Sequence, residues 1–255
     1  MSEAILNDDA ALAAHLAECA GHILTEVRRA GIFGEKALGK AGDQTVNQFL
    51  VHALRETRGA DGLLSEEMKC DGSRLAKSRV WIVDPVDGTR EYGEARADWA
   101  VHIGLAIDGV ATVGAVALPD MNGGMVLRTD QPRPLPAAAD IPRMVVSRTR
   151  PAAEALAVAE AIGAELVPMG SAGAKAMAVI LGQAEIYLHS GGQYEWDSCA
   201  PVAVAKAHGL HCSRLDGREP VYNQEDTYMP DILICRPEYA PRIFAALART
   251  AAKAG

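Results

Sequence analysis

The sequence feature that most restricts the fold is an apolar segment that runs directly into two aspartates. Residues 80–83 are large and apolar, and they are predicted to form a buried strand. Asp84 and Asp87 follow, and Pro85 fixes the backbone between them, so both carboxylates are expected to converge on one point. Two carboxylates that meet beside a buried strand repel each other unless a cation lies between them. The segment therefore predicts a cation site at the end of this strand.

The chemistry of this segment narrows the class of ion and ligand. Oxygen-only ligands suit Mg, Mn or Ca rather than Zn. Gly88 and Thr89 come next and offer backbone N–H groups at a turn that can open a short helix, which suits a phosphate oxygen. The same residue types are also typical of an ordinary polar turn. A turn needs no second carboxylate at the end of a buried strand, so the sequence favours a site.

Around this segment, the first half of the chain is predicted to hold two helices and a mostly antiparallel sheet. Asn7 or Asp8 is expected to cap the first helix, and Asp43 to cap the second, because Asn and Asp are preferred capping residues. Residues 99–107 and 110–118 flank an Asp-Gly pair, which predicts a hairpin.

A proline-rich connection marks the expected domain boundary. Residues 129–142 contain four prolines and no periodicity, which is typical of an exposed connection. The prediction is an N-terminal α+β domain over residues 1–142 and a C-terminal α/β domain over residues 143–255, where strands and helices alternate.

Charge and composition exclude several classes of partner. The chain has 25 Lys and Arg against 33 Asp and Glu, a formal net charge of -8, so a nucleic acid polymer is not expected to bind.

The cysteines and the apolar segments indicate where the protein acts. Its five cysteines are scattered without a C-x-x-C pair, which favours a reducing cytoplasm over a disulfide framework. No apolar run reaches about 18 residues, so neither a signal peptide nor a membrane span is expected. Monomer and homodimer both remain open.

Three motifs in a fixed order support a more specific interpretation. They are Glu66-Glu67, Asp-Pro-Val-Asp-Gly-Thr at residues 84–89, and Trp-Asp-Ser-Cys-Ala at residues 196–200. Alone, the acidic pair would be an exposed surface pair and Asp197 a helix cap. Together they resemble the magnesium-dependent, lithium-sensitive phosphatases of the inositol monophosphatase superfamily. The resemblance implies the layered α-β-α-β-α sandwich shared with fructose-1,6-bisphosphatase, an α/β (α+β) fold.

The resemblance also implies a site. It predicts two or three Mg ions, with Mn as an alternative ion and Li as an inhibitor, and an activated water rather than a protein nucleophile. Asp43 and Thr89 are expected to position that water, although the family's T-x-x-D segment has Lys40 in place of its threonine. The implied metal ligands are Glu66, Asp84, the carbonyl of Val86, Asp87 and Asp197. Of these, Glu66 and Asp87 are also expected to be catalytic.

Within the superfamily, the chain resembles the CysQ-type 3'(2'),5'-bisphosphate nucleotidases, which convert 3'-phosphoadenosine 5'-phosphate into AMP and phosphate. The residues that carry this resemblance are Thr89 to Tyr92, Ser147-Arg148 and the segment 213–217. Substrate contacts are therefore expected from Gly88, Thr89, Ser147, Arg148, Lys175 and Asp197.

Some positions depart from this branch and leave alternatives open. Arg150 replaces a histidine of the nucleotidases, and His189 lies where the inositol enzymes have a glutamate. Lys175 is otherwise read as a surface lysine of a helix. An inositol phosphate, fructose 1,6-bisphosphate or the sulfated nucleotide is the alternative substrate. A non-catalytic sensor of a phosphorylated metabolite is the alternative outside the enzymes.

Overall fold

The computed structural model describes residues 3–69 and 72–254. Within these residues, the strands form two five-stranded sheets. The first has the order β1-β2-β3-β4-β5, with β1 parallel to β2 and the remaining pairs antiparallel. The predicted hairpin around Asp108 is confirmed by β3 and β4. The strands are β1 (Gly62–Ser65), β2 (Arg79–Asp87), β3 (Ala100–Ile107), β4 (Val110–Leu118) and β5 (Met125–Arg128).

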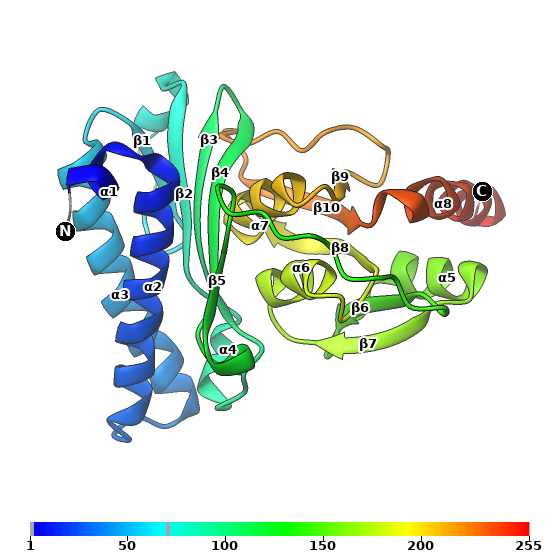
Figure 1. The fold of residues 1–255 in the computed structure, drawn as a ribbon, viewed down its shortest axis with the longest axis horizontal. Coiled ribbons are helices and arrows are strands. Elements are labelled where there is room, and N and C mark those ends of the chain that lie inside the picture. The colour runs from blue at the N-terminus through cyan, green and yellow to red at the C-terminus, as the bar shows by residue number, and fades with distance from the viewer. Residues whose placement is uncertain (1–2, 70–71, 255) are drawn as a thin grey trace.

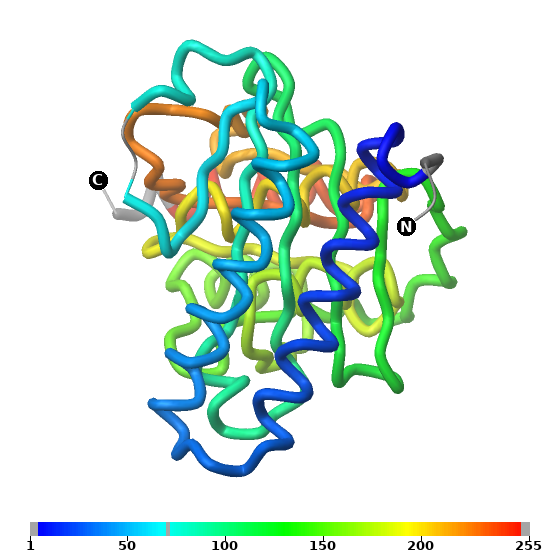
Figure 2. The backbone as a smooth tube through the Cα atoms, turned by 90° about the vertical axis from the view of Figure 1, so that its left-hand side faces the viewer, coloured from blue at the N-terminus to red at the C-terminus, as the bar shows by residue number. Residues whose placement is uncertain are grey.

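Two long helices cover one face of this sheet. After the short α1 (Glu3–Asn7), α2 (Asp9–Arg29) and α3 (Glu35–Arg58) lie across the sheet, as Figure 2 shows from the helical side. The predicted cap of α2 is confirmed, since the Asp8 carboxylate accepts the N–H of Ala11 at 2.9 Å. Apolar side chains of both helices pack against Val101 and Ile103, which point from β3 to this side.

The expectation that Asp43 caps the second helix is wrong. That helix begins at Glu35 with Gly34 as its N-cap, so Asp43 lies two turns inside it and is buried. The preference of aspartate for a cap is a local tendency. Here the side chain of Asp43 is used instead for a contact with Thr89, described below.

The second half forms a mixed sheet with the order β7-β6-β8-β10-β9. β6 is parallel to β7 and β8, whereas β10 is antiparallel to β8 and β9. Its strands are β6 (Arg143–Ser147), β7 (Glu165–Met169), β8 (Ile186–Tyr194), β9 (His211–Ser213) and β10 (Tyr228–Cys235).

Helices lie between the two sheets and outside the second one. α6 (Ala172–Ile180) and α7 (Glu195–Ala207) fill the space between the sheets, and α5 (Ala153–Ile162) and α8 (Ala240–Ala254) cover the outer face of the second sheet (Figure 1). The predicted α-β-α-β-α sandwich is confirmed. The remaining helical turns are α4 (Thr89–Gly93) and the 3-10 turns Ser73–Ala76, Met121–Gly123 and Pro237–Tyr239.

Close packing of α7 on the first sheet depends on two glycines. A Cβ at Gly104 would lie 2.9 Å from the backbone nitrogen of Ala200, and one at Gly114 would lie 2.6 Å from its carbonyl oxygen. Because neither strand position carries a side chain, α7 approaches β3 and β4 directly. This approach brings the start of α7 next to the end of β2.

The connection at residues 129–142 links β5 to β6. One buried apolar cluster contains residues from both sides of it, among them Ile82 and Tyr187. The division into domains at residue 142 stays a prediction. Among the described helices, none is both long enough and apolar enough to cross a membrane.

Candidate metal centre and active site

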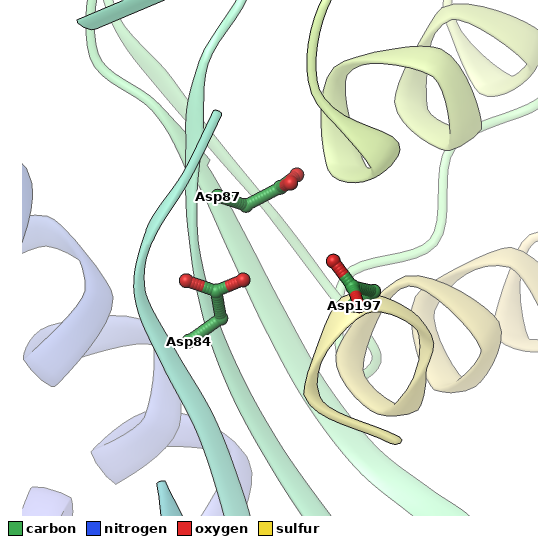
Figure 3. A group of neighbouring side chains, drawn as sticks. All are labelled: Asp84, Asp87 and Asp197. Atoms are coloured by element: carbon green, nitrogen blue, oxygen red, sulfur yellow. The ribbon is translucent and has the colours of Figure 1, made fainter. Parts of the chain in front are cut away.

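An irregularity in β2 places the two predicted aspartates on one side. Side chains three apart on a regular strand point to opposite faces. In the pairing of β2 with β3, however, Asp84 lies opposite His102 and Asp87 opposite Ala100, with a register shift between them. The extra residue on β2 reverses the alternation, as in a β-bulge, where a proline such as Pro85 is tolerated. Both carboxylates therefore face the start of α7 (Figure 3).

The third carboxylate comes from α7. Asp197 occupies the third position of this helix, and its Oδ2 accepts the N–H of Tyr194 at 2.7 Å, which fixes the first turn. One oxygen each of Asp84, Asp87 and Asp197 lies within 4.8 Å of the others (Figure 3). The structure therefore brings together three of the four predicted carboxylate ligands in one cluster.

Burial and neighbouring charges shift the pKa values of the three clustered carboxylates in different directions. Burial and the charges of Glu66 and Asp87 raise the pKa of Asp84 well above its usual range. Burial and the charge of Asp87 raise the pKa of Asp197 to about 7. Asp87 differs: burial acts to raise its pKa, but the contacts with His102 and the N–H of Gly173 lower it below the usual value.

Glu66 and Asp43 lie at the edge of this cluster. Glu66 follows β1, and its side chain is exposed as a whole, but the surrounding protein and the charges of Glu67 and Asp87 raise its pKa to about 7. Asp43 is buried on α3, where burial and the charges of Glu66 and Glu67 raise its pKa to about 8. In the described part of the chain, Asp43 Oδ1 is a buried atom without a hydrogen-bond partner.

These residues fit a hard divalent cation. The donors are carboxylate oxygens, the ligands that Mg and Mn prefer, and burial and neighbouring negative charges raise the pKa values of Asp84 and Asp197. A cation would remove this repulsion.

The turn after Asp87 connects the cluster to Asp43. Gly88 has a left-handed backbone with φ of 85°, and a Cβ there would lie 2.8 Å from the Cβ of Ser171, so only glycine fits without strain. Thr89 then opens α4, as predicted. Its hydroxyl lies 3.3 Å from Asp43 Oδ2 and 3.1 Å from the carbonyl oxygen of Val86, and either oxygen can accept its proton.

The predicted substrate residues of the second half already have partners within the protein. Lys175 is buried on α6, and its ammonium group donates to the carbonyls of Gly170 and Ser171. Burial lowers the pKa of Lys175. Arg148 follows β6 and pairs with Glu91 and Glu94, each at 2.6 Å.

Ser147 ends β6, and its hydroxyl accepts the N–H of Arg150 at 3.2 Å. The roles of Ser147, Arg148 and Lys175 toward a substrate stay predictions.

Sequence reasoning missed three groups that contact Asp87. The N–H groups of Ala172 and Gly173, at the start of α6, donate to its carboxylate at 3.1 and 2.6 Å. The Nε2 atom of His102 lies 3.1 Å from its Oδ2. A histidine within an otherwise apolar strand was the signal that could have pointed to His102.

The raised pKa values predict that Mg²⁺ binds more tightly as the pH rises from 6 to 8. At pH 6, the carboxyls of Glu66 and Asp197, two of the expected metal ligands, retain protons that a cation has to displace. A carboxyl with a raised pKa in the folded state also stabilises the protein at low pH and loses that contribution as the pH passes its folded pKa. The metal-free melting temperature should therefore fall over this range while the increase caused by Mg²⁺ grows. If Mg²⁺ raised the melting temperature by the same amount at every pH, this prediction would be contradicted.

The chain belongs to the inositol monophosphatase family, whose model matches residues 9–252. Members of this family are metal-dependent. A protein of Mycobacterium leprae named 3'-phosphoadenosine 5'-phosphate phosphatase is 48% identical over 247 residues, which cover 91% of each chain. The 3'(2'),5'-bisphosphate nucleotidase CysQ of Escherichia coli K12 is 28% identical over 199 residues, which cover 74% of this chain and 81% of that protein.

Solved structures show the same fold. The structure of CysQ from Bacteroides thetaiotaomicron superposes with a TM-score of 0.75 at 25% identity, covering 88% of this chain and 96% of that one. An inositol monophosphatase from Zymomonas mobilis also superposes with a TM-score of 0.75, at 21% identity, covering 97% and 100% of the two chains. The second similarity supports the fold alone.

Proposed function

We propose that this protein is a Mg²⁺-dependent phosphomonoesterase that removes the 3'-phosphate of 3'-phosphoadenosine 5'-phosphate and leaves AMP. The observation that carries the proposal is the convergence of three carboxylates at the junction of β2 and α7, with the Asp43–Thr89 pair beside them. The 48% identity to the Mycobacterium leprae phosphatase over nearly its whole length supports the choice of substrate.

In this proposal, Asp84, Asp87 and Asp197 hold the cations, and Glu66 and the carbonyl of Val86 complete the set. When bound, divalent cations supply positive charge that acidifies a water molecule and stabilises the phosphate oxygens. The chain itself holds the carboxylates at fixed positions: the bulge in β2 directs Asp84 and Asp87, and the hydrogen bond from Tyr194 directs Asp197.

Asp43 and Thr89 are the residues that handle the proton of the attacking water. Asp43 Oδ2 lies at hydrogen-bonding distance from the Thr89 hydroxyl, which leaves Oδ1 without a partner in the described structure. We assign Oδ1 as the atom that accepts the proton. A carboxylate with a pKa near the working pH is suited to this role, and that of Asp43 is raised to about 8 without metal.

The phosphate that is not cleaved is expected to face the second half of the chain. Lys175 is a buried cation on α6, and the charges of Asp87 and Asp197 act to raise its pKa against the effect of burial. Ser147 and Arg148 lie at the end of the neighbouring strand β6. Arg148 would have to exchange Glu91 or Glu94 for a substrate phosphate.

A substrate comparison tests the proposal. Phosphate release should be measured with 3'-phosphoadenosine 5'-phosphate, its sulfated form, fructose 1,6-bisphosphate and inositol 1-phosphate. The first should have the highest kcat/KM. A preference for the sugar or inositol phosphate would refute the substrate assignment and leave the phosphatase class standing.

We expect Lys175→Met to lower kcat/KM for 3'-phosphoadenosine 5'-phosphate by roughly 10- to 100-fold. This corresponds to one lost charge-assisted contact of about 1.5 to 3 kcal/mol. Hydrolysis of a monophosphate such as p-nitrophenyl phosphate should change much less. Lys206→Met is the matched control, because Lys206 pairs with Glu219 near the opposite end of α7. An equal loss on both substrates would assign Lys175 to the fold or the metal site.

We also infer a reducing compartment, the cytoplasm, as the place of action. Four cysteines, Cys19, Cys199, Cys212 and Cys235, are free thiols, and three of these are buried. Cys70 lies outside the described residues.

A further inference from the structure

His102 is a buried polar residue that the proposed chemistry does not use. Its side chain is 0% exposed, and it lies on β3 opposite Asp84. On the same face of the strand, its neighbours Ala100 and Gly104 are small, so the imidazole is the group that reaches furthest toward α6 and α7. Burying an imidazole among helices is costly unless its nitrogens find polar partners.

The two ring nitrogens contact two different parts of the metal centre. Nε2 lies 3.1 Å from Asp87 Oδ2, and Nδ1 lies 3.0 Å from the carbonyl oxygen of Trp196, the residue before Asp197. Although it lies close to Asp87, Nε2 is a buried atom without a hydrogen bond in the described structure. A single side chain thus touches a carboxylate from β2 and the backbone that carries a carboxylate from α7.

The start of α6 packs directly against the imidazole of His102. A Cβ at Gly173, the first turn of α6, would lie 2.0 Å from His102 Nε2. The N–H of Gly173 also donates to Asp87 Oδ2 at 2.6 Å. The imidazole, the α6 backbone and the Asp87 carboxylate are therefore packed closely together.

We propose that His102 is a positioning residue that sets the separation of Asp87 and Asp197, and with it the affinity of the site for divalent cations. The inference rests on the proposed metal site. His102 contacts Asp87 through its Nε2 atom and the first turn of α7 through its Nδ1 atom. Groups that orient metal ligands in this way typically account for 10- to 100-fold in metal affinity.

The test compares three variants without substrate. His102→Leu removes both polar contacts at similar volume, and His102→Gln restores a polar group of similar reach. His208→Leu is the matched control: His208 is also buried, also has an Nε2 without a partner in the described part of the chain, and contacts the opposite end of α7 through the carbonyl of Val204. Melting temperature is recorded across a Mg²⁺ titration, and kcat and KM are then measured at saturating Mg²⁺.

We expect His102→Leu to raise the Mg²⁺ concentration needed for a given increase in melting temperature by about 10- to 100-fold. KM for the nucleotide at saturating Mg²⁺ should not change. His102→Gln should fall between this variant and the wild type, and His208→Leu should match the wild type. If His102→Leu does not fold, His102→Phe, which keeps a planar ring without polar atoms, gives the same comparison.

Two results would overturn the inference. One is a folded His102→Leu or His102→Phe protein with the Mg²⁺ response of the wild type. The other is a His208→Leu protein whose Mg²⁺ response weakens as much, since that would reduce the effect to packing around α7. Failure of the proposed function is distinct, because the wild-type protein itself would then show neither Mg²⁺ stabilisation nor turnover.

Discussion

Asp84→Asn is expected to lower kcat by more than about 100-fold at saturating Mg²⁺ and, at the same time, to raise the melting temperature of the metal-free protein. The expected decrease in kcat is larger than the decrease typical for residues that only orient metal ligands, because Asp84 is proposed to be a ligand itself. The stabilisation arises because burial and the charges of Glu66 and Asp87 oppose ionisation of Asp84. The hydrogen bond from the N–H of Val86, 3.0 Å long, can be kept by the asparagine oxygen.

The sign of the stability change follows from the pKa. A carboxyl whose pKa is raised in the folded state contributes stability below its unfolded pKa, near 4, and loses it as the pH rises. At pH 7.5 the neutral asparagine avoids that loss. Asp87 should behave oppositely, because its pKa is lowered and it contributes stability above pH 4. Asp87→Asn should therefore inactivate the enzyme and also lower the metal-free melting temperature.

The Asp84→Asn and Asp87→Asn variants distinguish a cation site in this segment from an ordinary polar turn. Thermal melting in EDTA at pH 7.5 and phosphate release at saturating Mg²⁺ provide the two measurements. Retention of more than a few per cent of wild-type turnover by Asp84→Asn would remove Asp84 from the metal centre. A lower metal-free melting temperature for Asp84→Asn would contradict the electrostatic account of the cluster.

The second large effect is expected at Asp43. Asp43→Asn keeps the size of the side chain and an acceptor for the Thr89 hydroxyl, but removes the base. The loss of a positioned base typically lowers kcat by about 10²- to 10⁴-fold. KM and the Mg²⁺ response should change little, because Asp43 is not in the cluster of Asp84, Asp87 and Asp197.

Thr89 provides the control for this assignment. Thr89→Ser keeps the hydroxyl that lies 3.3 Å from Asp43 Oδ2 and should retain most of the activity. Thr89→Val has the same shape without the hydroxyl and should resemble Asp43→Asn. Equal activity of the serine and valine variants would show that the hydroxyl does not take part.

The sequence was sufficient to predict that the carboxylates of Asp84, Asp87 and Asp197 cluster, but not the geometry that brings them together. The apolar strand before Asp84 and the order of the motifs identified the carboxylates. Their convergence depends on a register shift against β3, which is a long-range pairing that the local sequence does not reveal. The same limitation explains the error at Asp43, where a tertiary contact with Thr89 overrides the local preference for a cap.

Short strands and contacts between distant residues could not be predicted from the sequence either. The strands β1, β5 and β9 contain four, four and three residues, too few for a clear alternation of apolar and polar side chains. The pairs of Arg148 with Glu91 and Glu94 join residues more than 50 positions apart. His102 was missed because its partners lie on β2 and α7, although its place in an apolar strand was visible.

The most direct test follows 3'-phosphoadenosine 5'-phosphate by ³¹P NMR in the presence of the purified protein. With Mg²⁺, the account predicts that the signal of the 3'-phosphate disappears, that inorganic phosphate appears in equal amount, and that the 5'-phosphate remains as AMP. EDTA or the Asp84→Asn substitution should stop the reaction. Loss of the 5'-phosphate first, no reaction with Mg²⁺, or equal turnover by the Asp84→Asn protein would contradict it.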